Sequence, residues 1–257
     1  MSVASRSRAF TLLEVALVVF MLAILASGLA MPFATQMTLR RQAETNRLLE
    51  EAREAVLGFA LANGRLPCPA TAASHGRESF EPGTDEREGR CSNFHDGFLP
   101  GASLGFSPLD GSGFVRDAWG LESNRVRYAV FGAGQSVAGI PNPLTRANGM
   151  QAATLAGLGS APGYLHLCAS GAGVGPSSCG AASNQLTRRA AFVILSLGPN
   201  SATTPPPGSD ESRNVDGDPV FVSREAGVAR DNAFDDQLTW VATSLLASRL
   251  AAAGRLP

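Results

Sequence analysis

Glu14 is the strongest candidate for a functional residue, because it is a lone carboxylate within an apolar stretch. Residues 15–34 contain no charged side chain, and residues 10–13 extend the stretch on the other side of Glu14. Burying a carboxylate in a membrane segment costs about 2.5–3.5 kcal/mol, so such a residue usually has a functional partner. The alternative is that Glu14 lies close enough to the end of the segment to reach the polar headgroups. A cationic partner would be available if residues 1–9 were removed, since Phe10 of a neighbouring chain would then carry a free amine.

A second concentration of carboxylates lies towards the C-terminus, among glycines and prolines. Its members are Asp210, Glu211, Asp216, Asp218, Asp231, Asp235 and Asp236. Calcium takes about six to eight oxygen ligands from flexible loops of this kind. Asp216, Asp218, Asp235 and Asp236 are the candidate calcium ligands, although no cofactor is required by the sequence. The alternative is a solvated acidic loop in which Asp235 caps a helix.

Four cysteines, Cys68, Cys91, Cys168 and Cys179, can form two disulfides. Three pairings are possible, and nearness in sequence favours Cys68–Cys91 and Cys168–Cys179, each closing a loop rich in Gly, Pro and Ser. Zinc binding is the competing interpretation. It is disfavoured because the sequence has no CxxC or HxxxH spacing.

Catalytic and nucleic-acid-binding signatures are absent from the sequence. It has no GxSxG, HExxH, P-loop or GxGxxG motif, so we do not expect an enzyme. The formal net charge is −1, which argues against nucleic-acid binding through a general basic surface.

The apolar stretch predicts the first structural element. About 20 apolar residues can cross the bilayer core as a helix, so residues 10–34 are expected to be transmembrane. The helix is expected to continue to residue 62, because Leu48, Ala52, Ala55, Phe59 and Ala62 share one helical face. Asn63-Gly64 then provides a stop signal. The basic pair Arg6 and Arg8 favours a cytoplasmic N-terminus.

The rest of the chain, residues 63–257, is expected to form a globular head with many loops. Short apolar runs at 125–131, 164–168, 191–197 and 219–223 predict strands. A helix is expected after Asp235-Asp236, where Leu238, Val241, Leu245 and Leu246 recur at helical spacing. The predicted fold class is α+β, with an antiparallel sheet packed on the long N-terminal helix.

Ala9-Phe10-Thr11-Leu12-Leu13-Glu14, after a short basic leader and before a long apolar helix, resembles the N-terminus of type IV pilins and type II secretion pseudopilins. Two segments of the head also resemble major pseudopilins. One is Asp117-Ala118-Trp119-Gly120, followed by Tyr128, and the other runs from Ser196-Leu197-Gly198 through the acidic loop to Asp235-Asp236. The second segment corresponds to the calcium loop of that family, although the loop here is longer and contains three consecutive prolines.

The resemblance implies how the chain is processed and where it acts. A prepilin peptidase would remove residues 1–9 by cutting between Ala9 and Phe10, and the new amine would be methylated. Family members usually have Gly where this chain has Ala9. Glu14 would pair with the N-terminus of an adjacent subunit during filament assembly. The implied location is a bacterial inner membrane, crossed once, with a periplasmic head. The implied partners are other pilin-like subunits and an inner-membrane assembly platform.

Three functions follow from these observations. The leading one is a structural subunit of a type IV pilus or type II secretion pseudopilus. The alternative is a minor or tip pilin whose head binds a secreted substrate, a surface or DNA. The third is a membrane-anchored periplasmic enzyme that shares only the leader.

Overall fold

The computed structural model describes residues 11–161, 163–229 and 232–256, with backbone alone for 25–34, 228 and 229. The chain divides into two compact units, residues 1–43 and 44–257. Helix α1 (Leu12–Asn63) supplies the described part of the first unit and the beginning of the second. It ends at the predicted stop, where Gly64 takes a left-handed φ of 68°.

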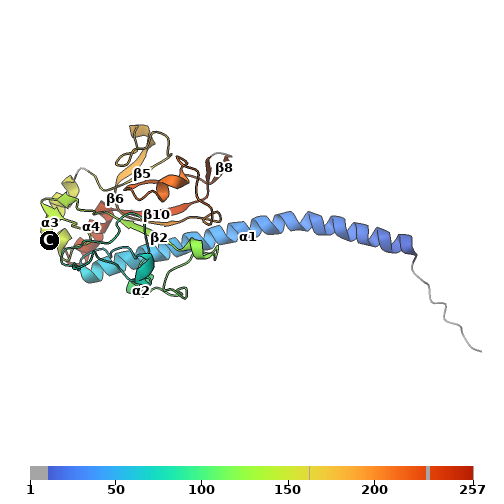
Figure 1. The fold of residues 1–257 in the computed structure, drawn as a ribbon, viewed down its shortest axis with the longest axis horizontal. Helices are drawn as coiled ribbons and strands as arrows, with labels where there is room; N and C mark the ends of the chain where they lie inside the picture. Colours follow the sequence, from blue (N-terminus) through green and yellow to red (C-terminus); the bar gives the residue numbers. More distant parts are fainter. Residues whose placement is uncertain (1–10, 162, 230–231, 257) are drawn as a thin grey trace, which may run out of the picture. The chain divides into compact units, whose positions relative to one another are not determined.

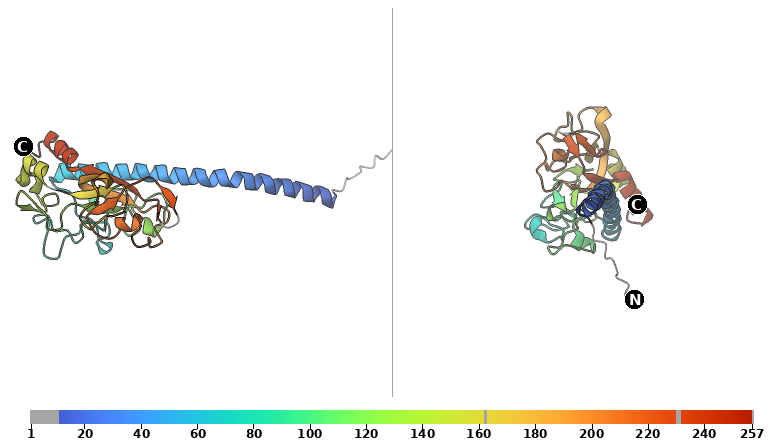
Figure 2. Two further views of the ribbon diagram at one scale, coloured as in Figure 1. Left: turned by 90° about the horizontal axis from the view of Figure 1, so that it is seen from above. Right: turned by 90° about the vertical axis from the view of Figure 1, so that its right-hand side faces the viewer.

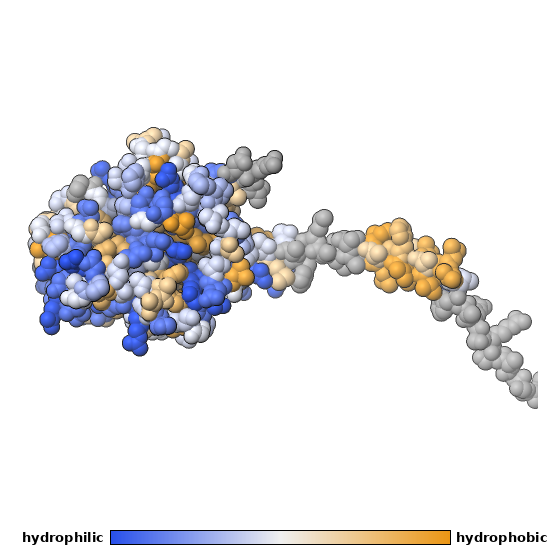
Figure 3. Space-filling model, viewed as in Figure 1, coloured by the Kyte–Doolittle hydropathy of each residue, from blue (hydrophilic) through white to orange (hydrophobic). Residues whose placement is uncertain are grey.

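The first unit presents apolar side chains to solvent. Leu12, Val15, Phe20 and Ile24 are all more than half exposed, and Figure 3 shows this part of α1 as a continuous hydrophobic run. Within the residues that the structure describes, however, no helix combines the length and apolar character needed to cross a bilayer. A crossing needs about 20 residues of nearly unbroken apolar sequence. The predicted transmembrane segment at 10–34 and the predicted single-pass inner-membrane location are therefore not supported.

The second unit contains a six-stranded sheet, two small hairpins and three further α-helices. The sheet strands are β1 (Gly97–Phe98), β2 (Arg127–Val130), β5 (Leu165–Cys168), β6 (Gln185–Ser196), β7 (Val220–Val222) and β10 (Gln237–Ala242). The hairpins are β3 (Ser136–Val137) with β4 (Ile140–Pro141), and β8 (Gly227–Ala229) with β9 (Asn232–Phe234). The helices are α2 (Gly101–Leu104), α3 (Gly149–Ser160) and α4 (Thr243–Ala252), with short 3₁₀ turns at Ala72–Ser74, Glu122–Asn124, Ala182–Asn184 and Glu211–Asn214.

Strand β6 organises the sheet because it pairs with three neighbours. It is antiparallel to β2, β5 and β10, with Tyr128 opposite Ile194 and Thr239 also opposite Ile194 on the other side. Its residues Ala190–Leu195 are completely or almost completely buried. The apolar run predicted as a strand at 191–197 is therefore the centre of the fold.

The sheet is mixed, which corrects the predicted antiparallel arrangement. Strand β7 lies parallel to β5, with Leu167 opposite Phe221. The chain leaves β5, returns through β6 and crosses a long loop before β7, so β7 runs in the direction of β5. Parallel neighbours require a crossover connection of this kind. The fold is α+β with a mixed sheet, and among the described residues the predicted transmembrane helix is not found.

The end of α1 forms one wall of the hydrophobic core. Leu49, Ala52, Val56 and Ala60 are each no more than 1% exposed and belong to the same cluster as the buried residues of β2 and β6. In both views of Figure 2 the sheet and the C-terminal part of α1 lie against each other. The predicted face beginning at Leu48 is rotated, since Ala55 and Phe59 are only half-buried and Ala62 is exposed.

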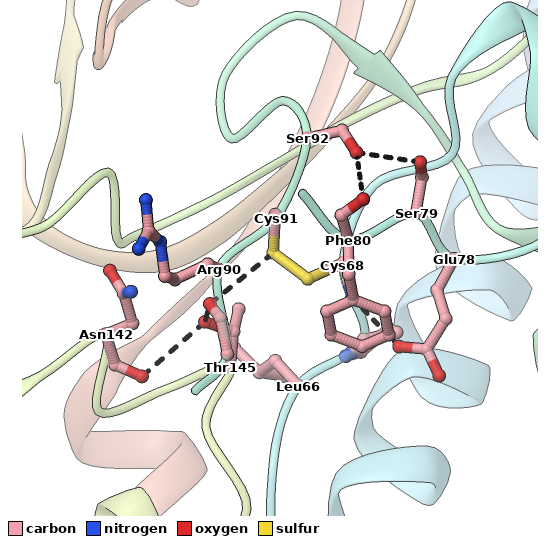
Figure 4. Close-up of a disulfide and its surroundings, with 12 residues drawn as sticks. Leu66, Cys68, Glu78, Ser79, Phe80, Arg90, Cys91, Ser92, Asn142 and Thr145 are labelled. Atoms are coloured by element: carbon pink, nitrogen blue, oxygen red, sulfur yellow. Dashed lines mark hydrogen bonds between the residues drawn. A yellow bond between two sulfur atoms is a disulfide. The ribbon is translucent and has the colours of Figure 1, made fainter. Parts of the chain in front are cut away.

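Both predicted disulfides are confirmed. Cys68 bonds Cys91 across 23 residues, and Cys168 bonds Cys179 across 11 residues. Figure 4 shows the first bond next to Phe80 and Thr145, and the hydroxyl of Thr145 donates to the carbonyl of Gly89 at 2.7 Å. Each disulfide holds an irregular segment that contains little regular secondary structure.

Removing the first disulfide should destabilise the head substantially. Because cross-linking restricts the unfolded chain, we expect Cys68→Ala/Cys91→Ala to lose about 3 kcal/mol of unfolding free energy. The double variant Cys168→Ala/Cys179→Ala is the matched comparison. Its loop is half as long, so its loss should be smaller by about 0.6 kcal/mol. Urea unfolding of both variants and the parent measures these differences, and a loss below about 1 kcal/mol for the first pair would contradict the prediction.

Candidate functional site

Three carboxylates, Glu211, Asp235 and Asp236, converge beside the end of the central strand. Glu211 begins the 3₁₀ turn Glu211–Asn214, in the long connection between β6 and β7. Asp235 and Asp236 form the link between β9 and β10. One oxygen from each carboxylate lies within 4.8 Å of the others. Two segments more than 20 residues apart in sequence are thus joined at a single acidic site.

Hydrogen bonds fix the positions of these carboxylates. The amide of Asn200 donates to both oxygens of Glu211, at 3.2 and 3.0 Å, and the backbone N–H of Asp235 donates to Glu211 Oε1 at 2.8 Å. The Asn214 amide donates to Asp236 Oδ2 at 2.7 Å. Asn214 also bonds the backbone of Val222 through both its amide nitrogen and its carbonyl oxygen, which anchors the site to β7.

The electrostatic environment opposes ionisation of the two aspartates. Burial, together with the neighbouring Glu211, raises the pKa of Asp235 to about 7. Burial is also the main cause that raises the pKa of Asp236 to about 8, and Glu211 and Asp235 add to it. Among the described residues, no arginine forms an ion pair with any of the three carboxylates. Arg127 favours the charged form of Asp236, but its ion pair is with Asp96.

Two further observations suit a bound cation. Asp235 Oδ1 is buried and accepts no hydrogen bond in the part of the chain that the structure describes. Gly198 has a φ of 65°, and a Cβ added there would lie 2.0 Å from Asp235 Oδ1. The backbone therefore approaches the carboxylate as only glycine permits.

These donors fit a hard divalent cation. Three clustered carboxylates with an uncompensated charge match the oxygen preference of calcium. A bound calcium ion would neutralise the charges that burial opposes and would hold the β6–β7 loop to the β9–β10 link. Glu211, Asp235 and Asp236 are the residues that would ligate it.

The predicted ligand set is only partly brought together. Asp235 and Asp236 belong to the cluster, whereas Asp216 and Asp218 do not. Asp216 Oδ1 accepts from the backbone of Asp218 at 3.1 Å, and Asp218 Oδ1 accepts from Val220 at 2.9 Å. Both therefore cap the approach to β7. Glu211, one of the seven acidic residues noted in the sequence, is the third member of the cluster, and its local sequence does not distinguish it from the other six.

Of the three residues predicted to take part in processing and assembly, the structure describes only Glu14. Ala9 and Phe10 lie outside the described residues. Glu14 lies in the first turn of α1, is exposed, and its backbone N–H donates to Thr11 Oγ1 at 3.3 Å. Acidic side chains suit the first turn of a helix, because they face its positive dipole end.

The Asp117–Gly120 segment has a structural role near the end of β6. Asp117 accepts from the backbone of Trp119 at 2.9 Å and from the amide of Asn124 at 3.1 Å, and Ser196 donates to it as well. The Asn124 amide also reaches the carbonyl of Gly198. This network ties the turn before β2 to the end of β6, next to the acidic cluster.

A scan against protein-family models gave no match, and neither the curated proteins nor the solved structures contained a significant match to the chain.

Proposed function

We propose that the chain is a structural subunit of a filament of the type IV pilin or pseudopilin class, assembled through the first part of α1. The observation that carries this proposal is the exposed apolar surface of α1 around Glu14. The N-terminal motif that resembles those families supports the same function.

The apolar side chains occupy all sides of the helix and not a single stripe. Leu12, Leu13, Val15, Leu17, Val18, Val19, Phe20, Met21, Leu22 and Ile24 are all at least half exposed. A helix that is apolar all round is stable only when several neighbours cover it. Burial of apolar surface contributes about 25 cal/mol per square ångström, so the packing of these helices into a bundle would strongly favour association of the subunits.

Glu14 gives the bundle its register in this proposal. After cleavage between Ala9 and Phe10 by a prepilin peptidase, the amine of Phe10 carries a positive charge. In an apolar bundle an unpaired carboxylate is costly, whereas a carboxylate paired with an amine is tolerated. Neighbouring subunits would therefore associate at the axial offset that brings Glu14 of one chain to Phe10 of the next.

We further propose that calcium bound by Glu211, Asp235 and Asp236 stabilises the head for this role. The chain would be non-enzymatic, and its partners would be other pilin-like subunits and the assembly platform.

A minor or tip subunit is the second candidate, favoured by a cavity of about 720 Å³ next to the Cys68–Cys91 disulfide. Its lining includes Glu81, Arg90, Asn93 and Arg146, which could bind a polar partner. A subunit present at a few copies per filament would indicate this function, and a subunit present along its whole length would indicate the first.

Cysteine cross-linking tests assembly through α1. All four native cysteines are in disulfides, so Phe20→Cys introduces a single free thiol on the apolar surface. In cells that assemble the filament, a bifunctional maleimide should link Phe20→Cys chains into covalent dimers, because each chain carries one free thiol. Leu121→Cys, at an exposed apolar residue of the head, is the matched control and should yield mainly monomer. Equal dimer yields from Phe20→Cys and Leu121→Cys, or no dimer from Leu17→Cys, Phe20→Cys and Ile24→Cys alike, would contradict the proposal.

A further inference from the structure

A groove between α3 and α4 has the features of a ligand site that is separate from both the acidic cluster and the apolar part of α1. Its volume is about 500 Å³, within the range of small-molecule sites. The described residues that line it are Leu155, Leu158 and Gly159 of α3, Arg189 of β6, and Thr243, Ser244, Ala247, Ser248 and Ala251 of α4. In Figures 1 and 2 the two helices lie together at one end of the head.

The charge in this groove is positive and comes from one side chain. Among its described lining residues none is acidic, and Arg189 is the only charged one. Arg189 lines the groove together with Thr243 and Ser244 of the first turn of α4. The N-terminus of α4 has no side-chain cap and adds the partial positive charge of the helix dipole.

Arg189 is held rigidly and retains donors. Its Nη1 donates to the carbonyl of Ala161 at 3.1 Å, and its Nη2 donates to Leu158 and Gly159 at 3.1 and 2.8 Å. The guanidinium also lies 5.5 Å from the ring centroid of Tyr164. A guanidinium has five N–H donors, so two remain for an anion. In the described part of the chain no carboxylate pairs with Arg189.

Thr243 is an independent indication of a ligand. This residue lines the groove at the first position of α4 and is only 5% exposed. Its hydroxyl has no hydrogen-bond partner within the residues that the structure describes. A buried hydroxyl without a partner is costly, and a ligand oxygen at the helix N-terminus would satisfy it.

We propose that this groove binds a medium-length acyl carboxylate, with its carboxylate between Arg189 and the N-terminus of α4 and its chain along α4. From Ser244 to Ala251 the helix rises about 10 Å, which suits an extended chain of about eight carbons. Leu155, Leu158, Ala247 and Ala251 provide apolar contacts along this length.

The lining favours an acyl chain over a peptide. A bound peptide would bring a buried amide for every residue, and each would need a hydrogen-bond partner. Beyond Thr243 and Ser244, the helix contributes only the hydroxyl of Ser248. An acyl chain makes no such demand, and its single anionic end matches the single cationic side chain of the groove. The site does not depend on the proposed assembly through α1.

Calorimetric titration of the full chain with octanoate tests the proposal, with 1-octanol, octyltrimethylammonium and inorganic phosphate as comparison probes. We expect one octanoate per chain, bound at least 10-fold more tightly than any comparison probe. Equal binding of octanoate and octanol would show an apolar surface without carboxylate recognition and would overturn the proposal. Binding of phosphate as tightly as octanoate would show an anion site without an acyl groove, which also overturns it.

Two matched pairs of variants locate the site. Ala251→Leu fills the groove and should weaken octanoate binding at least 10-fold. Ala252→Leu, at the neighbouring exposed residue that does not line the groove, should leave binding unchanged.

Arg189→Gln should remove the preference for octanoate over octanol, and Arg188→Gln should retain it. Thr243→Val should weaken binding about fivefold without lowering the melting temperature, because the hydroxyl has no partner in the free protein. Unchanged octanoate affinity in Ala251→Leu and Thr243→Val would place the ligand elsewhere.

Discussion

Replacing Glu14 with alanine should abolish filament assembly while leaving the head folded. Glu14 is exposed in the first turn of α1 and does not belong to the hydrophobic core of residues 44–257. Its removal should therefore not change the urea unfolding of the head. In the assembled bundle, however, the Phe10 amine of a neighbour would lose its only proposed anion. Leaving one partner of a buried ion pair alone costs about 3–5 kcal/mol, which corresponds to more than a 100-fold loss of association.

Three substitutions make this test specific. Glu14→Gln keeps the size of the side chain but not its charge, so it should fail to assemble like Glu14→Ala. Glu14→Asp keeps the charge on a shorter side chain and should assemble partially. Glu44→Ala removes another exposed glutamate of the same helix and should assemble normally. Filament yield by electron microscopy and sedimentation measures the effect. Normal filaments from Glu14→Gln would show that the charge has no role.

Local patterns in the sequence were sufficient for several parts of the head. Three of the predicted strand segments contain β2, β5 and β7, and the segment 191–197 covers only the second half of β6, because the local signal is a short β-branched or aromatic run bounded by Gly, Pro or polar residues. The disulfide pairing was also predicted from local spacing, since each cysteine bonds the one nearest to it in the sequence.

Features that depend on long-range pairing were predicted incorrectly. The sequence around Leu238 and Val241 fits helical spacing, but Gln237–Ala242 is strand β10 because its backbone pairs with β6. The helix begins only at Thr243. Trp240 and Val241 have high strand propensity, and tertiary pairing decided between two weak local signals. The parallel pairing of β5 and β7 could not be predicted from local sequence, because the composition of an apolar run does not indicate the direction of its neighbouring strand.

The acidic site was likewise predictable only where its residues are close in sequence. Asp235 and Asp236 are adjacent and could be identified together, whereas Glu211 joins them only through the folding of the long β6–β7 connection. Asp216 and Asp218 are equally acidic in the sequence, but their carboxylates accept backbone hydrogen bonds before β7. Carboxylate density therefore identified the region, and only the fold shows which three carboxylates converge in it.

In the absence of divalent cations, the head should become less stable as the pH rises from about 5 to about 9. The pKa of Asp235 is raised to about 7 and that of Asp236 to about 8, from an ordinary value of 3.8. Between these values the folded state binds more protons than the unfolded state, so the free energy of unfolding falls with increasing pH. The buried Asp236 alone should account for about 4 kcal/mol after allowance for relaxation of the site. Asp218, with a pKa raised to about 6, acts in the same direction. Asp110, with a pKa lowered to about 2, contributes only below this range.

Calcium should reverse this loss, because the cation replaces the protons that neutralise the cluster. At pH 8, saturating calcium at 100 times its dissociation constant should raise the free energy of unfolding by about 2.7 kcal/mol. At pH 5 the gain should be much smaller, since the aspartates are already protonated. Urea unfolding at both pH values, with EDTA and with calcium, measures both effects.

Asp236→Asn distinguishes a cation site from an ordinary buried acid. The amide keeps the shape of the side chain but removes the charge that burial opposes, so at pH 8 without calcium the variant should be more stable than the parent. It should also lose the stabilisation by calcium. Asp216→Asn, outside the cluster, is the matched control and should retain the full calcium response.

If Asp236→Asn is destabilised at pH 8 and still responds to calcium, Asp236 is charged in the folded state and is not a ligand. If the parent shows no response to calcium but Asp236→Asn is stabilised as predicted, the cluster is a proton-dependent structural site without a metal.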